Sequence, residues 1–236
     1  MARPRSTGYA GQLEQILAAA ARHFATRGYT ATTMNDVAAA CGVSKATLYH
    51  YVRDKQDLLA HITAGHVARL EALVLEVAAR PMAPEARLRQ LIHRFMQAYA
   101  GAQDEHRVLT EDVKFLHAAE RERVLEAQRR VVAAVADAVA ALRPDLGAAQ
   151  LHKPLALLLF GMINWTFTWL RAGGTLSHET LAPVVEALFF GGLPAVQAPA
   201  PSPRSPARRR GSGCAPAPGP APWPAPARPR RRPRPG

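Results

Sequence analysis

The chain has 236 residues, of which 48% are hydrophobic, and a formal net charge of +12. This length suits one or two compact domains, and the two cysteines lie too far apart in sequence and context to indicate a disulfide framework, which favours a reducing compartment. The longest apolar run, 155–163, is too short to span a bilayer, so we expect a cytoplasmic protein with no membrane partner.

The sequence from Gly8 to Gly192 predicts helices throughout, because Ala, Leu, Arg and Glu dominate and strand-like alternation is absent. A first helix is expected over 9–27, followed by a glycine that can take a left-handed cap. The second helix begins after Thr33, and the third spans 45–52 after Ser44. Both residues carry hydroxyl groups that can cap a helix N-terminus.

Two short helices joined by a glycine-containing turn form a helix-turn-helix, whose second helix enters the major groove of DNA. That helix presents polar residues where a core helix would carry aliphatic ones. Thr47 can contact a base edge, whereas Lys45 and Lys55 suit phosphate contacts. The predicted DNA-binding residues are Thr33, Ser44, Lys45, Thr47, Tyr49, His50 and Lys55. The alternative is a helical hairpin with a solvated polar face.

Residues 12–59 resemble the DNA-binding domain of the TetR family of transcriptional repressors. The resemblance rests on F-x-x-x-G-Y at 24–29, T-T-x-x-D-V-A at 32–38, G-V-S-K-x-T-L-Y-x-Y at 42–51 and K-x-x-L-L at 55–59. Val52 and the Arg53-Asp54 pair depart from the common pattern without removing a groove-facing position. The family implies an all-α homodimer that represses a palindromic operator, with an N-terminal three-helix helix-turn-helix domain and a C-terminal helical domain for ligand binding and dimerisation.

The expected domains are a DNA-binding domain at 9–55, a ligand-binding and dimerisation domain at 56–193, and a tail at 194–236. The further helices are expected at 54–79, 84–100, 107–117, 119–142, 148–172 and 178–190. The helix at 54–79 joins the two domains. A ligand that tilts it would change the spacing of the two recognition helices in a dimer, which must match DNA half-sites about 34–36 Å apart or a multiple of that distance.

The helices at 148–172 and 178–190 are expected to form the dimer interface. The first is apolar around most of its circumference, which predicts burial on more than one side. The second adds an apolar stripe, and two such helices from each subunit would make a four-helix bundle. Burial inside a larger single-chain core is the alternative.

The segment 160–182 resembles the C-terminal domain of TetR regulators that respond to acyl-CoA thioesters of fatty-acid, aromatic-acid or steroid catabolism. The matching residues are Gly161, Met162, Asn164, Trp165, Trp169 and Gly174. Asn164 needs a polar partner, either a ligand or a group across a helix interface. Trp165 and Trp169 lie four residues apart and either wall a pocket or pack in a core.

An acyl-CoA effector needs an apolar tunnel and a basic mouth. The residues proposed for the pocket are Phe95, Met96, Tyr99, Phe115, Met162, Asn164, Trp165 and Trp169. The candidate cations of the mouth are Arg87, Arg94, Lys114, Arg121, Arg123, Arg129 and Arg130. A hydrophobic drug or aromatic acid would need the tunnel without the basic mouth.

Neither an enzyme nor a metalloprotein is indicated. The sequence has no nucleophile elbow, phosphate loop or paired metal motif, and the spacing of His93, His106, His117 and Asp112 matches no known metal site. We expect no catalytic residues, no metal and no cofactor apart from the effector.

The C-terminal segment 194–236 holds nine arginines and no acid, whereas 58–193 is neutral. Its Pro-, Ala- and Arg-rich composition predicts a disordered tail. The tail is either an electrostatic arm for nucleic acid or a solvated extension without a specific role. With such an arm the protein could instead be a non-specific nucleic-acid binder, which is an alternative to both kinds of ligand-responsive repressor.

Overall fold

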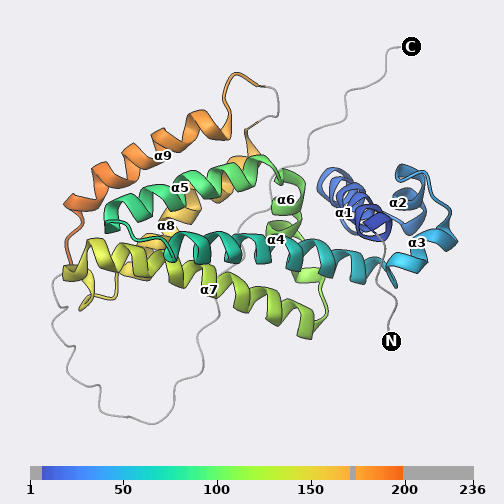
Figure 1. The fold of residues 1–236 in the computed structure, drawn as a ribbon, viewed down its shortest axis with the longest axis horizontal. Helices are drawn as coiled ribbons and strands as arrows, with labels where there is room; N and C mark the ends of the chain where they lie inside the picture. Colours follow the sequence, from blue (N-terminus) through green and yellow to red (C-terminus); the bar gives the residue numbers. More distant parts are fainter. Residues whose placement is uncertain (1–6, 171–173, 199–236) are drawn as a thin grey trace, which may run out of the picture. The chain divides into compact units, whose positions relative to one another are not determined.

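The computed structural model describes residues 7–170 and 174–198, and the regular elements within them are helices (Figure 1). The α-helices are α1 (Thr7–Arg27), α2 (Met34–Ala40), α3 (Lys45–Tyr51), α4 (Lys55–Ala78), α5 (Pro84–Ala100), α6 (Gln103–Glu111), α7 (Ala118–Leu142), α8 (His152–Asn164) and α9 (His178–Gly192). Short 3-10 turns include η1 (Val113–Phe115), η3 (Trp165–Thr168) and η4 (Leu193–Ala195). The prediction of an all-α chain is confirmed.

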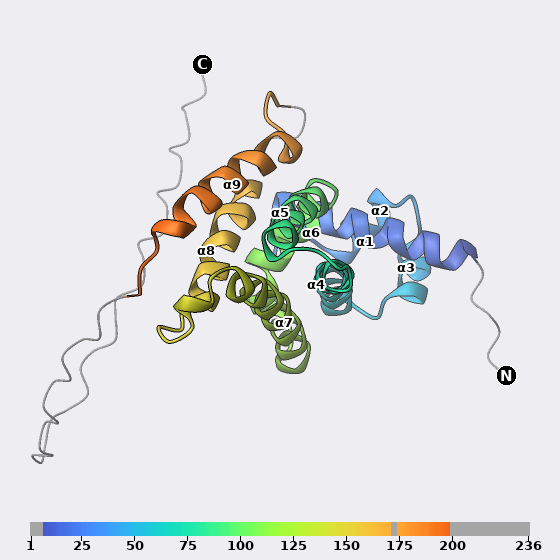
Figure 2. The same cartoon turned by 60° about the vertical axis from the view of Figure 1, so that its left-hand side comes forward.

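Two apolar clusters form the core. One joins α1, α2, α3, the first half of α4, α6 and the start of α7, and the other joins the second half of α4 with α5, α7, α8 and α9. Helix α4 therefore contributes to both, and it lies alongside α7 in both views (Figures 1 and 2). Of the first three helices, α1 packs on both α6 and α4, and the three share one apolar cluster with α4 and α6, so they do not form a separate core.

Helix α4 is also the one helix among the described residues that is long and apolar enough to cross a membrane by length and composition. A core helix of a globular domain passes the same test. The side chains of α4 that face both clusters, such as Leu58, Leu59, Ile62 and Val77, are buried within the chain itself. Packing in the core therefore accounts for its apolar character.

Two helices differ clearly from their predicted ranges. The helix expected at 107–117 is α6, which begins at Gln103 and gives way to η1. The helix expected at 148–172 is α8, which begins only at His152 because Gln150 has a positive φ of 55°. It changes to η3 at Trp165, where the Thr166 hydroxyl donates to the Ile163 carbonyl at 2.7 Å. Such side-chain bonds compete with regular helical hydrogen bonds.

The start of the predicted tail also needs correction. Residues 194–198 belong to the described part of the chain, and η4 lies at their start. The Arg143 guanidinium donates to the carbonyls of Leu193 and Val196, the latter at 2.8 Å. The remainder of the predicted tail, 199–236, lies outside the described residues.

Candidate DNA interface and effector cavity

Local hydrogen bonds fix the geometry of α2, the turn and α3. Thr33 caps α2 in a capping box with Asp36, whose carboxylate accepts from the Thr33 backbone at 2.8 Å. Gly42 supplies the positive φ of 64° that the turn requires, and the Val43 backbone N–H then donates to the Ala38 carbonyl at 3.1 Å. The chain therefore reverses within a few residues and brings α3 against α2.

The exposed face of α3 is polar apart from one alanine. Leu48 is fully buried, whereas the side chains of Lys45, Tyr49 and His50 are exposed, and Tyr49 has an exposed fraction of 45%. An exposed tyrosine, lysine and histidine on a short helix offer hydrogen bonds to base edges and phosphates. Ala46 shares this face, and its methyl group can contact a thymine; it is not among the residues predicted to bind DNA.

The hydroxyl groups at the start of α3 bond to each other. Ser44 Oγ accepts from the Thr47 backbone N–H at 3.0 Å and lies 2.8 Å from Thr47 Oγ1. Thr47 is half-buried as a result. The Thr47 hydroxyl is therefore already engaged with Ser44, and this bond orients the start of α3. Tyr49 and His50 are more freely available for contacts with DNA.

Lys55 has a different role from the predicted phosphate contact. Its ammonium donates to the carbonyls of Tyr29 at 2.9 Å, Thr30 at 3.4 Å and Thr32 at 3.0 Å. It also lies 4.4 Å from the centre of the Tyr29 ring. Because an ammonium has three donors, these contacts use all of them. The charge of Lys55 holds the loop between α1 and α2.

A cavity of about 260 Å³ lies among α4, α5, α6, α7 and α8. Its wall is mostly apolar and consists of Val67, Leu70, Tyr99, His106, Leu109, Thr110, Gln128, Val131, Val132, Leu157, Phe160 and Asn164. The Tyr99 hydroxyl donates to Asn164 Oδ1 at 2.7 Å, so Asn164 finds its partner in the same chain. Burial raises the pKa of Tyr99 far above its usual range. This hydrogen bond joins α5 to the end of α8.

Two buried histidines extend this polar group across α6 to α4. His66 Nε2 lies 3.2 Å from His106 Nδ1, and the His106 ring stacks on Tyr99 with centroids 4.0 Å apart. Burial lowers the pKa of His66 to about 3 and that of His106 to about 4. The main chain of Asn164 partly offsets the shift of His106, although Nε2 of this ring makes no hydrogen bond of good geometry. Both rings are therefore neutral at pH 7.

The tautomers follow from the partners. The Arg69 guanidinium can only donate, so His66 Nδ1 accepts from it at 3.5 Å. The proton of neutral His66 is then on Nε2, which donates to His106 Nδ1. The proton of neutral His106 is consequently on Nε2. These assignments are inferred from hydrogen bonding, and they leave the polar side of the cavity without a formal charge.

Comparison with known proteins places these features in one family. Residues 16–62 match the model of bacterial regulatory proteins of the tetR family, and residues 81–193 match the tetracyclin repressor-like C-terminal domain. The crystal structure of a TetR-family transcriptional regulator from Bordetella parapertussis 12822 is 35% identical, with a TM-score of 0.73; the match covers 78% of this chain and 97% of that one.

The chain belongs to the TetR family. It is a DNA-binding transcriptional regulator rather than an enzyme. The HTH-type transcriptional repressor KstR2 of Rhodococcus jostii is 26% identical over 193 residues, which cover 80% of this chain and 94% of that protein. The structure of AibR in complex with isovaleryl coenzyme A and operator DNA is 25% identical, with a TM-score of 0.64, and the match covers 75% and 97% of the two chains.

The cavity of this TetR-family chain contains some of the predicted pocket residues and not others. Tyr99 and Asn164 line it, while Phe95 is buried beside it, with its ring 5.2 Å from that of Phe160. Met96 is fully buried and Met162 is half-buried, both in the core cluster of the C-terminal helices. Three further residues predicted for the pocket, Phe115, Trp165 and Trp169, do not line this cavity.

These three aromatic residues lie at the ends of helices. Phe115 is in η1 and packs against Tyr29. Trp165 and Trp169 have exposed fractions of 62% and 51%, so neither a pocket wall nor a core position within the chain describes them. The four-residue spacing predicted a shared helical face, but the chain changes to a 3-10 turn at Trp165, where that spacing no longer applies.

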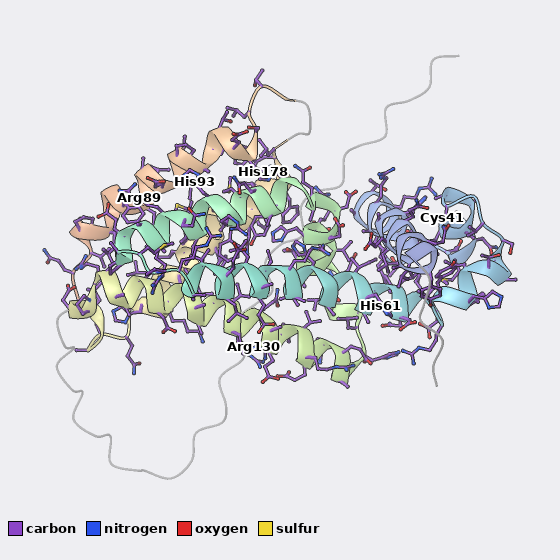
Figure 3. All side chains as sticks on the ribbon, in the orientation of Figure 1. Cys41, His61, Arg89, His93, Arg130 and His178 are labelled. Carbon is purple, nitrogen blue, oxygen red and sulfur yellow. The ribbon has the colours of Figure 1, made fainter. Side chains whose placement is uncertain are left out.

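The predicted basic mouth is largely neutralised. Four of its seven cations lie beside acidic side chains, in the pairs Arg94–Glu76, Arg123–Glu120, Arg129–Glu122 and Arg130–Glu71. Figure 3 shows Arg130 on the side of α7 that faces α4. Exposed pairs of this kind contribute only about 0–1 kcal/mol each, so an incoming anionic group can exchange with them. They nevertheless remove the concentration of unpaired positive charge that the hypothesis requires.

The histidines considered as metal ligands have other partners or lie apart. His93 Nε2 lies 2.8 Å from Glu186 Oε2, next to an Arg89–Glu186 pair that joins α5 to α9 (Figure 3). His106 pairs with His66. Among the described residues there is no group of three or more side chains that could hold a metal ion.

Proposed function

We propose that the protein is a homodimeric repressor that binds a palindromic operator in the cytoplasm and is released by a small-molecule effector. The observation that carries the DNA-binding role is the short, capped α3, which buries Leu48 and exposes Lys45, Tyr49 and His50. A recognition helix needs this combination, because its inner side must fix the angle at which the outer side enters the groove.

Exposed apolar side chains on α8, η3 and α9 support the dimer. They are Leu157, Leu158, Trp165, Trp169, Val184 and Leu188, and each has an exposed fraction of at least 50%. A second copy of the chain is the partner that fits, because a two-fold axis would place the same helices against each other. Size-exclusion chromatography with light scattering tests this: L158E with L188E should yield a folded monomer, and L75E, an exposed site on α4, should remain a dimer.

An acyl-CoA is the effector class that we propose. Three observations support it: the resemblance of 160–182 to acyl-CoA-responsive regulators, the isovaleryl coenzyme A bound by AibR, and an apolar cavity with an uncharged polar side. A thioester carbonyl can accept a hydrogen bond from such a site. A free carboxylate would be buried without a cation, which is unfavourable. The modest volume of about 260 Å³ favours a short acyl chain.

An uncharged hydrophobic metabolite or drug is the second candidate. The specific observation that favours it is the pairing of Arg94, Arg123, Arg129 and Arg130 with acids. Such an effector would need the cavity but no positive mouth.

Selection of operator sequences from random DNA by the purified protein, followed by mapping of the selected site upstream of neighbouring genes, tests the regulator. We expect a palindrome with salt-dependent binding. Short, long and aromatic acyl-CoAs, their free acids and uncharged hydrophobic compounds are then added to the complex. Release by a thioester but not by its free acid supports the acyl-CoA class, whereas release by uncharged compounds alone favours the second candidate. The absence of any selected palindrome would contradict the regulator itself.

A further inference from the structure

Helix α6 connects the cavity to the DNA-binding helices. His106, Leu109 and Thr110 of this helix line the cavity. The same helix packs against α1, and its last turn continues through Asp112 into η1. A displacement of α6 at the cavity therefore acts on η1 and α1, as well as on α4, which also packs against α6.

The η1 turn contacts the loop that precedes the helix-turn-helix. The Phe115 ring stacks on the Tyr29 ring with centroids 5.3 Å apart and an interplanar angle of 20°. Gln56, in the first turn of α4, donates from Nε2 to the Phe115 carbonyl at 2.7 Å. Phe115 is 36% exposed, so its ring contributes one stacking contact rather than a central part of the core.

The loop is also held by Lys55, whose ammonium binds the carbonyls of Tyr29, Thr30 and Thr32. The loop therefore contacts both Phe115 of η1 and Lys55 of α4. The residue that follows the loop is Thr33, the cap of α2. A shift of Tyr29 therefore displaces the start of α2 and, through the tight turn at Gly42, the orientation of α3.

We propose that Phe115 is a positioning residue that transmits displacement of α6 to the DNA-binding helices through Tyr29. This inference rests on the proposed ligand-responsive function and specifies its regulation. It gives the cavity a second route to α3 besides the continuous helix α4. Effector binding changes operator affinity through this route only if the two arrangements of the α6–η1–Tyr29 contact differ in affinity for the effector.

A cavity-filling substitution allows a test without knowledge of the effector. Val132 of α7 lines the cavity and is half-buried, so V132F places a ring where an effector would lie. Hydrogen exchange of the backbone amides in 28–33 is measured in the full chain, in V132F, in F115A and in the double variant. Operator affinity is measured in parallel on the selected DNA. L75A, which removes an exposed apolar side chain of α4 (65% exposed), is the matched control.

We expect V132F to change exchange in 28–33, and operator affinity by about tenfold. The change in exchange should disappear in the F115A background, and the change in operator affinity should become smaller because α4 remains as a route. Both changes should return with F115Y, which keeps the ring, and persist with L75A. The same response to V132F with and without F115A would overturn the proposal, as would the absence of any response to V132F. Because the exchange measurement uses neither effector nor DNA, failure of the acyl-CoA panel or of operator selection would count against the proposed function alone.

Discussion

The DNA-reading helices and the cavity are built in opposite ways. Thr33 to Tyr51 form one continuous segment held by its own caps and turn, whereas the cavity draws residues from five helices between Val67 and Asn164. In the first region the caps and the turn join residues that are only a few positions apart. In the second, the buried contacts of Tyr99, His106 and His66 join four helices, so a small displacement is shared among them. The fold thus separates the locally fixed DNA-binding segment 33–51, the reader, from a cavity whose helices can shift together when an effector binds.

The largest expected effect comes from removing the apolar anchor of the reader. Leu48 is fully buried, so L48A should lower the free energy of unfolding by about 2–5 kcal/mol. Urea denaturation followed by circular dichroism measures this loss, and operator binding should fall with it. L75A, at an exposed site, should stay within about 0.5 kcal/mol of the original chain. Unchanged stability in L48A would contradict the packing of α3 on α2.

The second prediction concerns the responsive region and its pH dependence. His66 and His106 have folded pKa values of about 3 and about 4, below the usual 6.5. Between the folded pKa values and 6.5, the unfolded chain therefore binds more protons than the folded chain does. The stabilisation is fully present above pH 6.5 and is lost as the pH falls toward 4, by at most about 1.4 kcal/mol per pH unit for each histidine.

Asp112 has the opposite effect on the free energy of unfolding over part of this range. Burial raises its pKa to about 6, so its contribution to stability is lost as the pH rises from about 4 to 6. The double variant H66Q/H106Q should show a flatter stability profile between pH 4 and 6.5 in urea titrations. The variant H61Q, at an exposed site on α4 (Figure 3), is the control. An unaltered profile in the double variant would show that these rings are not buried as neutral groups.

The same contrast explains what the sequence could predict. The caps Thr33 and Ser44 and the glycine of the turn act on neighbours within a few residues, so α2, α3 and the exposure of Tyr49 follow from local patterns. The partner of Asn164 is Tyr99, 65 residues away. The need for a partner was visible in the sequence, but only the packing of α5 on α8 identifies it.

Lys55 and Trp165 have surroundings that their local sequence does not reveal. A lysine beside a recognition helix is compatible with a phosphate contact, and nothing in its local sequence reveals the carbonyls of the loop at 29–32. The predicted helix at 148–172 extends past the observed end of α8 at Asn164, which places Trp165 on a regular helical face. The Thr166 hydroxyl bonds to the Ile163 carbonyl at this point. Thr63 makes a similar bond within the continuous helix α4, so a threonine alone does not reveal where α8 ends.

A third prediction sharpens the role of the exposed face of α3. Tyr49 is 45% exposed, so Y49A should leave folding intact and weaken operator binding by about 1–3 kcal/mol if a base contact is lost. K45A should weaken all DNA sequences about equally and reduce the salt slope by about one unit. Fluorescence anisotropy with operator and scrambled duplexes distinguishes these outcomes. Equal binding by Y49A and the original chain would exclude Tyr49 from the interface.

The smallest expected effect concerns Ser44, which caps α3 and is also predicted to lie at the DNA interface. S44A removes the side chain that accepts from the Thr47 backbone, and should cost about 0.5–2 kcal/mol of stability. S177A removes the equivalent cap of α9, with its bond to the Thr180 backbone, and should cost a similar amount while leaving operator affinity intact.

S44D distinguishes the two roles of Ser44. Aspartate is also a good cap and its charge is favourable at a helix N-terminus, so stability should return to that of the original chain. The same charge lies where α3 is proposed to approach phosphate, so operator binding should weaken, and most strongly at low salt, where charge repulsion is least screened. If S44D bound the operator as tightly as the original chain, the start of α3 would not lie near the DNA backbone, and the docking of the reader would have to be revised even if Tyr49 contacts a base.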